Sequence, residues 1–500
     1  MNFDLFYISP ELILALGGIL VLIAGVTARR WTTPERLGIF SPEVVSLVVL
    51  LAALVPSILL LAEKDVVRGV SQFFYGGEKY GLFAVDGLAL FFKIIAIVST
   101  AIVVFLSMDF FREIKFHRGE FYALLVFATL AITSLAASTD LIMIYLSLEF
   151  LSITSYILAG YLKQDPKSNE AAVKYFLYGA ISAAVMVYGM SILYGLTGTT
   201  NIAAIAQTFR AGYVPQELLF LATIFVLVGF GFKIAMVPFH QWSPDTYEGA
   251  PTPITAFLSV GSKAAGFAVL VRVLSTGITP DVLNWTPLII MFSAITMTVG
   301  NLIAIPQVNI KRMLAYSSIA QAGYLLLGVA SMAYSPLAVP AVLLYIFVYL
   351  FMNLGAFAVV TILSARLRSD NISDYAGLIK RAPAAAVCMV IFMLSLAGIP
   401  PTAGFVGKLY LFAAAIQSGH TALFWLAVVA IANTVVSAYY YLNVVRTMFF
   451  IEAEDTSPIS ASRPAKLAIW LTTAMTLVVL LYPEPFMKMA HVSASILMGM

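Results

Sequence analysis

Long, continuously apolar runs limit the fold of this chain more than any other feature of its sequence. Hydrophobic residues make up 61% of the 500 residues and charged residues only 11%, whereas a soluble domain carries roughly 25% charge. A run of about 20 apolar residues crosses a bilayer as a helix. The runs do not alternate between polar and apolar residues, as the strands of a membrane barrel would. We therefore predict an all-α polytopic membrane protein.

Fourteen transmembrane helices are expected, joined mostly by short loops, without a soluble domain or linker. Their predicted ranges are 8–28, 43–62, 84–108, 120–137, 140–162, 171–195, 217–240, 252–277, 286–304, 312–332, 337–364, 383–417, 421–447 and 465–483. The first apolar run is long enough to span the membrane and no basic region precedes it. We therefore interpret it as a span and not as a cleaved signal peptide.

The positions of lysine and arginine predict the orientation in the membrane. Eighteen of the 28 basic residues lie in loops after odd-numbered spans, and six lie on the other side. Because basic residues favour cytoplasmic loops, we expect both termini on the non-cytoplasmic side. The asymmetry also supports the number of spans, because one missed helix would place the later basic loops on the opposite side of the membrane.

Five charged residues lie well inside predicted spans and are not assigned to the loops at either end. They are Lys93, Lys233, Lys263, Lys408 and Glu149. One charge at the bilayer centre costs about 2.5–3.5 kcal/mol, so five unpaired charges would cost roughly 12–18 kcal/mol. These side chains must therefore face the bundle interior, pair with one another or contact water. Such residues are typical of proton relays, and we take them as the candidate functional site.

Each of these residues also has a structural interpretation. Lys233 is near the end of its span, from which a lysine can extend its ammonium group to the surface. For Lys263 and Glu149 the alternative is a buried ion pair that only holds helices together. The sequence around Lys93 favours neither a structural nor a functional role for this residue. His240 lies in a predicted cytoplasmic turn, which favours a surface role over a relay role.

Two of the predicted spans are interrupted by helix-breaking residues. The seventh carries two glycines, then Lys233, then Pro238. The twelfth is too long for one straight crossing and contains SLAGIPPTAGFVGKLYLF, in which Pro400 and Pro401 precede Lys408. Proline removes an amide donor and clashes with the preceding turn, and within a membrane the freed backbone groups must find protein or water. Interrupted helices in corresponding positions of two repeats indicate an ion site between them.

The spacing of these two spans also predicts the domain organisation. They are five spans apart, which fits two five-helix repeats, inverted because five is odd. We expect three N-terminal helices in 1–110, the first repeat in 120–277, the second in 286–447, and a C-terminal helix and tail in 465–500.

Cofactor sites are not expected in this chain. Its one cysteine, Cys388, excludes an internal disulfide and an iron–sulfur cluster held by cysteines of this chain alone. The four histidines are scattered, mostly in predicted loops, which argues against a haem or zinc site.

Four stretches, spread between residues 145 and 412, carry a specific pattern. They read FKIAMVPFHQWSPDTYEGAPTPITAFLSVGSKAAGF (Phe232 to Phe267), NIKRMLAYSSIAQAGY, GIPPTAGFVGKLYLF and YLSLEF. They resemble the signature region and the tenth, twelfth and fifth helices of the antiporter-like subunits of respiratory complex I. Three features favour one branch of that family: a length that fits fourteen helices, a lysine on the twelfth helix, and the motif HQWSPDTYEGAPTP.

The resemblance implies a role for each candidate residue. Glu149 would be the fifth-helix glutamate that pairs with Lys233 on the seventh helix. Lys263 would be the connecting lysine of the eighth helix and Lys408 the terminal lysine of the twelfth. Together they would form part of a hydrated polar axis through which protons move.

The resemblance also implies the setting in which the subunit works. It implies a translocase subunit of NADH–quinone oxidoreductase, with flavin and iron–sulfur clusters on other subunits and quinone as a substrate of the complex. The expected partners are neighbouring membrane-arm subunits of the M and K/J kinds and the lipid bilayer, and nucleic acid is not among them. The membrane would be the bacterial cytoplasmic (inner) membrane or the thylakoid membrane.

Two other functions use the same sequence features. The first is a cation/proton antiporter subunit of the Mrp type, which has no redox partner. The second is a structural membrane subunit whose buried charges only stabilise the bundle. The identity of the neighbouring subunits would distinguish the antiporter from a complex I subunit. A structural subunit would be recognised if neutralising the buried charges weakened assembly but left proton pumping by the assembled complex coupled to electron transfer.

Overall fold

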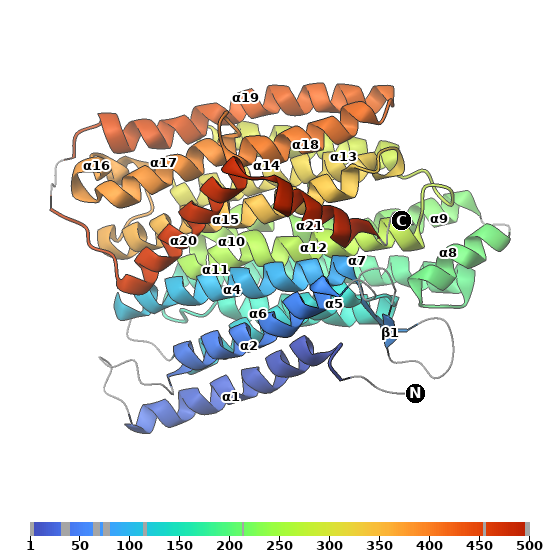
Figure 1. The fold of residues 1–500 in the computed structure, drawn as a ribbon, viewed down its shortest axis with the longest axis horizontal. Helices are drawn as coiled ribbons and strands as arrows, with labels where there is room; N and C mark the ends of the chain where they lie inside the picture. Colours follow the sequence, from blue (N-terminus) through green and yellow to red (C-terminus); the bar gives the residue numbers. More distant parts are fainter. Residues whose placement is uncertain are drawn as a thin grey trace.

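The computed structural model describes residues 5–31, 41–63, 71–73, 81–113, 118–212, 215–453 and 457–495. Long helices lie side by side and run in nearly the same direction (Figure 1). Within the described ranges, 13 helices are long and apolar enough to cross a membrane. The predicted all-α membrane fold is confirmed.

Eleven of the predicted spans are single helices. They are α1 (Ser9–Trp31), α2 (Pro42–Ala62), α4 (Gly87–Glu113), α5 (Gly119–Ala137), α6 (Leu141–Ala159), α7 (Pro166–Thr197), α13 (Thr286–Ala304), α14 (Ile310–Ala330), α15 (Ala338–Leu367), α19 (Thr421–Phe450) and α20 (Arg463–Leu481). Most of their ends lie within a few residues of the predicted ones, because the apolar runs fix the lengths.

The seventh and twelfth spans are interrupted close to their prolines, as predicted, whereas the two glycines of the seventh lie within its first helix. The seventh consists of α9 (Gln216–Ile234), a non-helical segment and the short α10 (Trp242–Gly249). The twelfth consists of α17 (Pro383–Ala397) and α18 (Ala403–Gln417), each shorter than a bilayer crossing. The eighth span is continuous but irregular: α11 (Thr252–Phe257) and α12 (Lys263–Arg272) are joined by π-helical residues Leu258–Ser262, and Val273–Gly277 are again π-helical.

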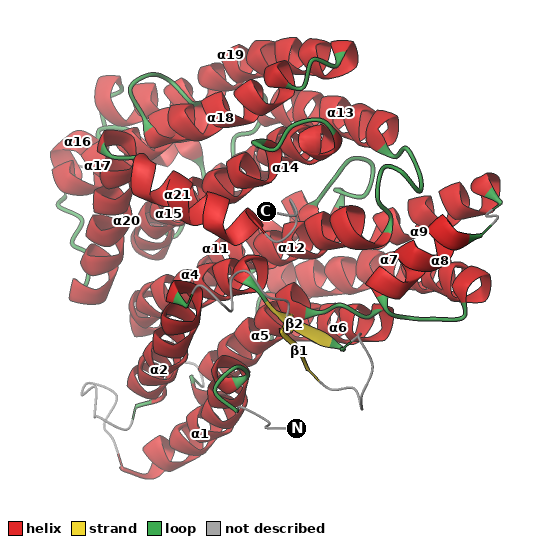
Figure 2. Ribbon diagram, turned by 45° about the vertical axis from the view of Figure 1, so that its right-hand side comes forward, coloured by secondary structure: helices red, strands yellow, loops and turns green. Residues whose placement is uncertain are grey.

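The buried centre of the bundle consists of the eighth, tenth and eleventh spans. The eighth span and α15 are buried along their most apolar stretch, and α14 nearly so. In contrast, α1, α2, α7, α19 and α20 expose many large apolar side chains, as expected of helices that face lipid. Both ribbon views place α1 at one edge of the bundle and α19 at the opposite edge (Figures 1 and 2).

Four smaller elements were not predicted. They are α8 (Ile202–Ala211), α16 (Leu378–Arg381), α21 (Glu484–Ala494) and a two-stranded sheet of β1 (Ser71–Phe73) and β2 (Phe83–Val85), which Figure 2 shows beside α5. The amphipathic α8 is held to the loop before α13 by Arg210, whose Nε lies 2.7 Å from Asp281 Oδ2. The guanidinium keeps the pKa of the Asp281 carboxyl low, at about 2. Short amphipathic helices escape a search for apolar runs because only one of their faces is apolar.

The orientation in the membrane stays a prediction. Several basic residues on which it depends, Arg36, Lys64 and Lys79 among them, lie outside the described residues.

Candidate functional site

The interruption of the seventh span begins after Ile234, so Lys233 is the penultimate residue of α9. Ala235 adopts the left-handed conformation (φ 57°), which is unfavourable for a residue with a Cβ and ends the helix. The Phe232 carbonyl accepts a hydrogen bond from the Ala235 amide at 3.1 Å and a second one from Trp242 Nε1 at 2.9 Å. The first residue of α10 thereby stabilises the end of α9.

Lys233 is fully enclosed by protein. Its side chain is only 1% exposed and Nζ donates to Ser152 Oγ on α6 at 3.2 Å. The alternative in which this lysine extends to the surface is therefore wrong. At the carboxyl end of α9, the ammonium also interacts favourably with the helix dipole.

Glu149 lies on α6, one turn before Ser152, and is half-buried. Its Oε1 is buried without a hydrogen-bond partner, and its charge interacts with that of Lys233. The exposed neighbours Leu146 and Phe150 show that this part of α6 faces the outside of the chain. The structure thus brings Glu149 near Lys233 without a direct hydrogen bond between them.

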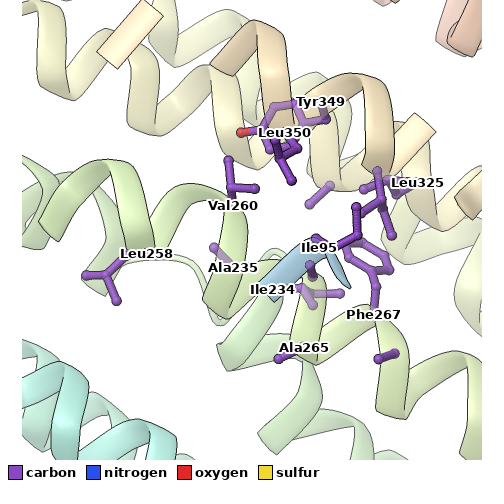
Figure 3. Close-up of a cluster of buried hydrophobic side chains, with 14 of the residues drawn as sticks. Ile95, Ile234, Ala235, Leu258, Val260, Ala265, Phe267, Leu325, Tyr349 and Leu350 are labelled. Carbon is purple, nitrogen blue, oxygen red and sulfur yellow. The ribbon is translucent and has the colours of Figure 1, made fainter. Parts of the chain in front are cut away.

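Lys263 lies at the centre of the bundle, where α12 begins after the π-helical segment. Its Nζ donates to the Ser318 backbone oxygen at 2.6 Å and to Ser318 Oγ at 2.5 Å. Tyr349 on α15 donates to the same Oγ at 2.9 Å. Figure 3 shows buried apolar side chains of the eighth, tenth and eleventh spans, among them Phe267 and Leu325, with Tyr349 beside Leu350. Because the neighbourhood is apolar, Ser318 is the principal polar partner of this ammonium group.

Lys408 bridges the interruption of the twelfth span. From α18, its Nζ donates to the Leu396 and Ala397 carbonyls at 3.3 and 3.0 Å and lies 4.4 Å from the centre of the Tyr324 ring. The two carbonyls end α17 and have no helical partner. Gly398 follows them with φ +78°, and a Cβ there would lie 2.8 Å from Lys408 Cδ. A glycine is therefore required both by the turn and by the close approach of the lysine.

Gln321 connects the surroundings of Lys263 and Lys408, and sequence reasoning missed it. It lies on α14 one turn after Ser318, and its Nε2 donates to the Leu396 carbonyl at 2.9 Å. Its Oε1 accepts a hydrogen bond from Tyr345. A single glutamine within an apolar helix gives no signal that distinguishes it from other polar residues.

Lys93 and His240 lie apart from these contacts. Lys93 on α4 is 1% exposed and pairs with Glu11 on α1, with Nζ and Oε1 2.8 Å apart. His240 is half-buried between α9 and α10, so it belongs to the interrupted part of the seventh span and not to a simple surface turn.

Two further charge clusters escaped prediction. Asp86, just before α4, forms a buried bidentate pair with Arg272 at 2.7 and 2.9 Å. On α10, Asp245 accepts from Lys174 of α7 at 2.6 Å and from Arg312 of α14 at 2.8 Å. Each of these residues lies near the end of a span, where the sequence alone predicts that charged side chains are exposed to water. In fact the Asp86–Arg272 pair is buried, and Asp245 joins α10 to α7 and α14.

A metal site is not evident in the described part of the chain, where no group of three His, Cys, Asp or Glu side chains could hold an ion. The arrangement consists of buried ammonium groups linked by hydroxyl, amide and carbonyl groups. Such groups can exchange protons, and none of them is a redox centre.

Comparison with known proteins identifies the class to which this fold and site belong. Residues 138–434 match the family model described as the transmembrane region of NADH:quinone oxidoreductase and Mrp antiporters. The chain is therefore an antiporter-like membrane subunit. It is 41% identical to NADH-quinone oxidoreductase subunit N of Desulfitobacterium hafniense over 99% of both chains. The chain belongs to the NADH-quinone oxidoreductase subunit N family.

Solved structures agree with this assignment. A chain of respiratory complex I from Thermus thermophilus with bound aureothin is 32% identical, with a TM-score of 0.79 over 96% of this chain and 99% of that one. A chain of the Mrp complex from Dietzia sp. DQ12-45-1b has a TM-score of 0.83 over 99% of this chain and 98% of that one, but only 21% identity, which shows the fold alone. The predicted resemblance to complex I is confirmed. The chain is a multi-pass membrane subunit of NADH-quinone oxidoreductase and part of its proton-translocating membrane arm.

Proposed function

We propose that Glu149, Lys233, Lys263 and Lys408 carry the protons that this subunit translocates. One observation supports this most: three ammonium groups are buried to 3% exposure or less. Two of them meet the same helix one turn apart: Lys263 donates to Ser318, and Lys408 shares the Leu396 carbonyl with Gln321. A purely structural role would be served as well by apolar residues of similar volume.

In the proposed sequence, energy released at the quinone site changes the distance between Glu149 and Lys233. When they approach, the carboxylate stabilises the protonated lysine. When they separate, the buried ammonium loses that stabilisation and gives its proton toward Lys263. Lys263 then passes a proton toward Lys408 by way of groups that both donate and accept, such as the Ser318 hydroxyl.

Lys408 is suited to receive and release a proton because its partners are backbone carbonyls and not a carboxylate. In the absence of a neighbouring anion, burial disfavours the charged form of a lysine. The two carbonyls and the Tyr324 ring compensate for part of this penalty. The charged and neutral forms are then close enough in free energy for the lysine to alternate between them.

We also propose the setting of this subunit. Electrons would pass from NADH to quinone through flavin and iron–sulfur clusters on other subunits, since this chain has a single cysteine. The neighbours would be membrane-arm subunits of the M and K/J kinds. The membrane would be a bacterial cytoplasmic or thylakoid membrane, with both termini on its non-cytoplasmic side. The two interrupted spans support the division into repeats at 120–277 and 286–447.

The test is proton pumping by the intact complex reconstituted in lipid vesicles, with Glu149→Gln or Lys233→Ala in this subunit. Both variants are expected to lower the number of protons moved per electron. The exposed Lys380→Ala (71% exposed) serves as the control. A wild-type ratio in both Glu149→Gln and Lys233→Ala would refute the proposal.

A further inference from the structure

One face of α4 carries a buried polar stripe that the lysine axis does not use. It consists of Asp86, Lys93, Thr100 and Ser107, all of them 1% exposed or less. Residues seven apart lie on the same face of a helix, two turns from one another. Most other residues of this helix are apolar, so the buried charges of the stripe carry an energetic cost.

The members of the stripe have partners on different helices. Asp86 pairs with Arg272, which also donates to the Ala136 carbonyl at the end of α5. The Thr100 hydroxyl lies 2.7 Å from that of Thr129 on α5. The Asp86–Arg272 pair has well-formed hydrogen bonds on both carboxylate oxygens, as a structural ion pair requires.

The pair of Glu11 and Lys93 is different. The Lys93 ammonium lies 2.8 Å from Glu11 Oε1, but the contact lacks the angles of a hydrogen bond. Both Glu11 carboxylate oxygens are buried without a hydrogen-bond partner. Glu11 lies in the first turn of α1, at the same end of the bundle as Asp86 and Arg272. A separation of 2.8 Å is within the range over which a proton can pass directly from one group to the other.

The stripe also reaches toward the lysine axis. Ser99, next to Thr100 on α4, has its Oγ 3.3 Å from the position a Cβ on Gly261 would occupy. Gly261 lies two residues before Lys263, in the π-helical segment, and α4 packs against α11 and α12. The Ser262 hydroxyl beside it is buried without a hydrogen-bond partner. Polar groups therefore lie between Lys93 and the centre of the axis, at a helix irregularity of the kind often found at functional sites.

We propose that Glu11 and Lys93 form a second proton-exchange site, which connects Lys263 with the end of the bundle where α1 begins. Protonated Lys93 gives one proton to the Glu11 carboxylate, and both groups become neutral. Glu11 releases that proton to water at this end. A proton from the side of Lys263, passed along the hydroxyl groups of Ser99 and Thr100, recharges Lys93. The inference rests on the proposed role of the lysine axis.

The test compares protons moved per electron by the reconstituted complex carrying Glu11→Gln, Lys93→Met or both, beside Lys233→Met. The site predicts that the double variant assembles, because no unpaired charge remains, but pumps as poorly as Lys233→Met. The exposed pair Glu484 and Lys488, neutralised in the same way, is the matched control and keeps the wild-type ratio.

The outcomes separate the two proposals. A wild-type ratio in the double variant shows that the pair is only structural and overturns the second site, even when Lys233→Met pumps poorly. A wild-type ratio in Lys233→Met overturns the axis and, with it, this site. If the double variant does not assemble, Thr100→Val decides, since valine has nearly the same shape without the hydroxyl. A lowered ratio there supports the route, and a wild-type ratio overturns it.

Discussion

Gln321 and Lys408 donate to the same oxygen, the Leu396 carbonyl, at 2.9 and 3.3 Å. That carbonyl is available because α17 ends one residue later, before the two prolines that interrupt the twelfth span. The break thus supplies an acceptor inside the bundle, at the depth where an ammonium group and an amide can share it. A continuous helix would have used this oxygen for its own hydrogen bond.

Replacing Gln321 with leucine tests this shared acceptor. The Tyr345 hydroxyl would lose its acceptor. The Leu396 carbonyl would lose one of its two donors and would still accept a hydrogen bond from Lys408. A buried polar group without a partner costs about 1–3 kcal/mol, so the complex should become less stable and pump fewer protons per electron. Stepwise heating in detergent followed by native gels measures the first effect and vesicle assays the second. Unchanged values for both would mean that Gln321 is not part of the path.

Lys408→Arg separates the charge of this residue from its ability to release a proton. Arginine keeps the positive charge beside the α17 carbonyls and Tyr324 but remains protonated in proteins. The variant should therefore assemble yet pump with a lower ratio. Lys380→Arg at an exposed position controls for the substitution itself. Full pumping by Lys408→Arg would show that a fixed charge suffices.

Asp86→Asn should be among the most damaging single changes in the described part of the chain. It leaves the buried Arg272 guanidinium without its counter-ion, at a cost of about 3–5 kcal/mol. We expect little assembled complex on native gels. The double variant Asp86→Asn with Arg272→Met should recover part of the assembly, because it removes the unpaired charge. Normal assembly of the single variant would contradict the buried pairing.

Asp245→Asn tests whether α10 is held in place by charge. Asp245 joins Lys174 and Arg312, whose side chains are partly exposed, so each contact should contribute about 1 kcal/mol or less. The loss of thermal stability should be small and should shrink as salt is raised from 10 mM to 1 M, because salt screens exposed pairs. A loss independent of salt would indicate packing and not charge.

The sequence predicts the buried lysines and the interrupted spans because both violate strong local rules. Lys263 and Lys408 lie inside apolar runs, and prolines lie where a helix would otherwise continue. Both features can be identified from the local sequence, without knowledge of the residues that they contact. The position of Lys233 at a helix end is harder to predict, because glycine and proline leave several residues at which α9 could stop.

Partners that depend on tertiary structure could not be predicted. Asp86 and Arg272 are 186 residues apart in the chain, and each lies at a span end where water is the expected neighbour. Glu11 has the same ambiguity in the first turn of α1. Ser318 and Gln321 gain their importance only when α14 packs against α15 and when Lys263 of α12 and the Leu396 carbonyl of α17 come within hydrogen-bond distance of it.

The most direct test of a proton path is an experimental map of the assembled complex at a resolution that shows ordered water. Water and hydroxyl groups are expected to connect Lys233, Lys263 and Lys408 in an unbroken chain at the depth of the lipid tails. A dry gap between these lysines, in every state of the working enzyme, would contradict proton transfer along them.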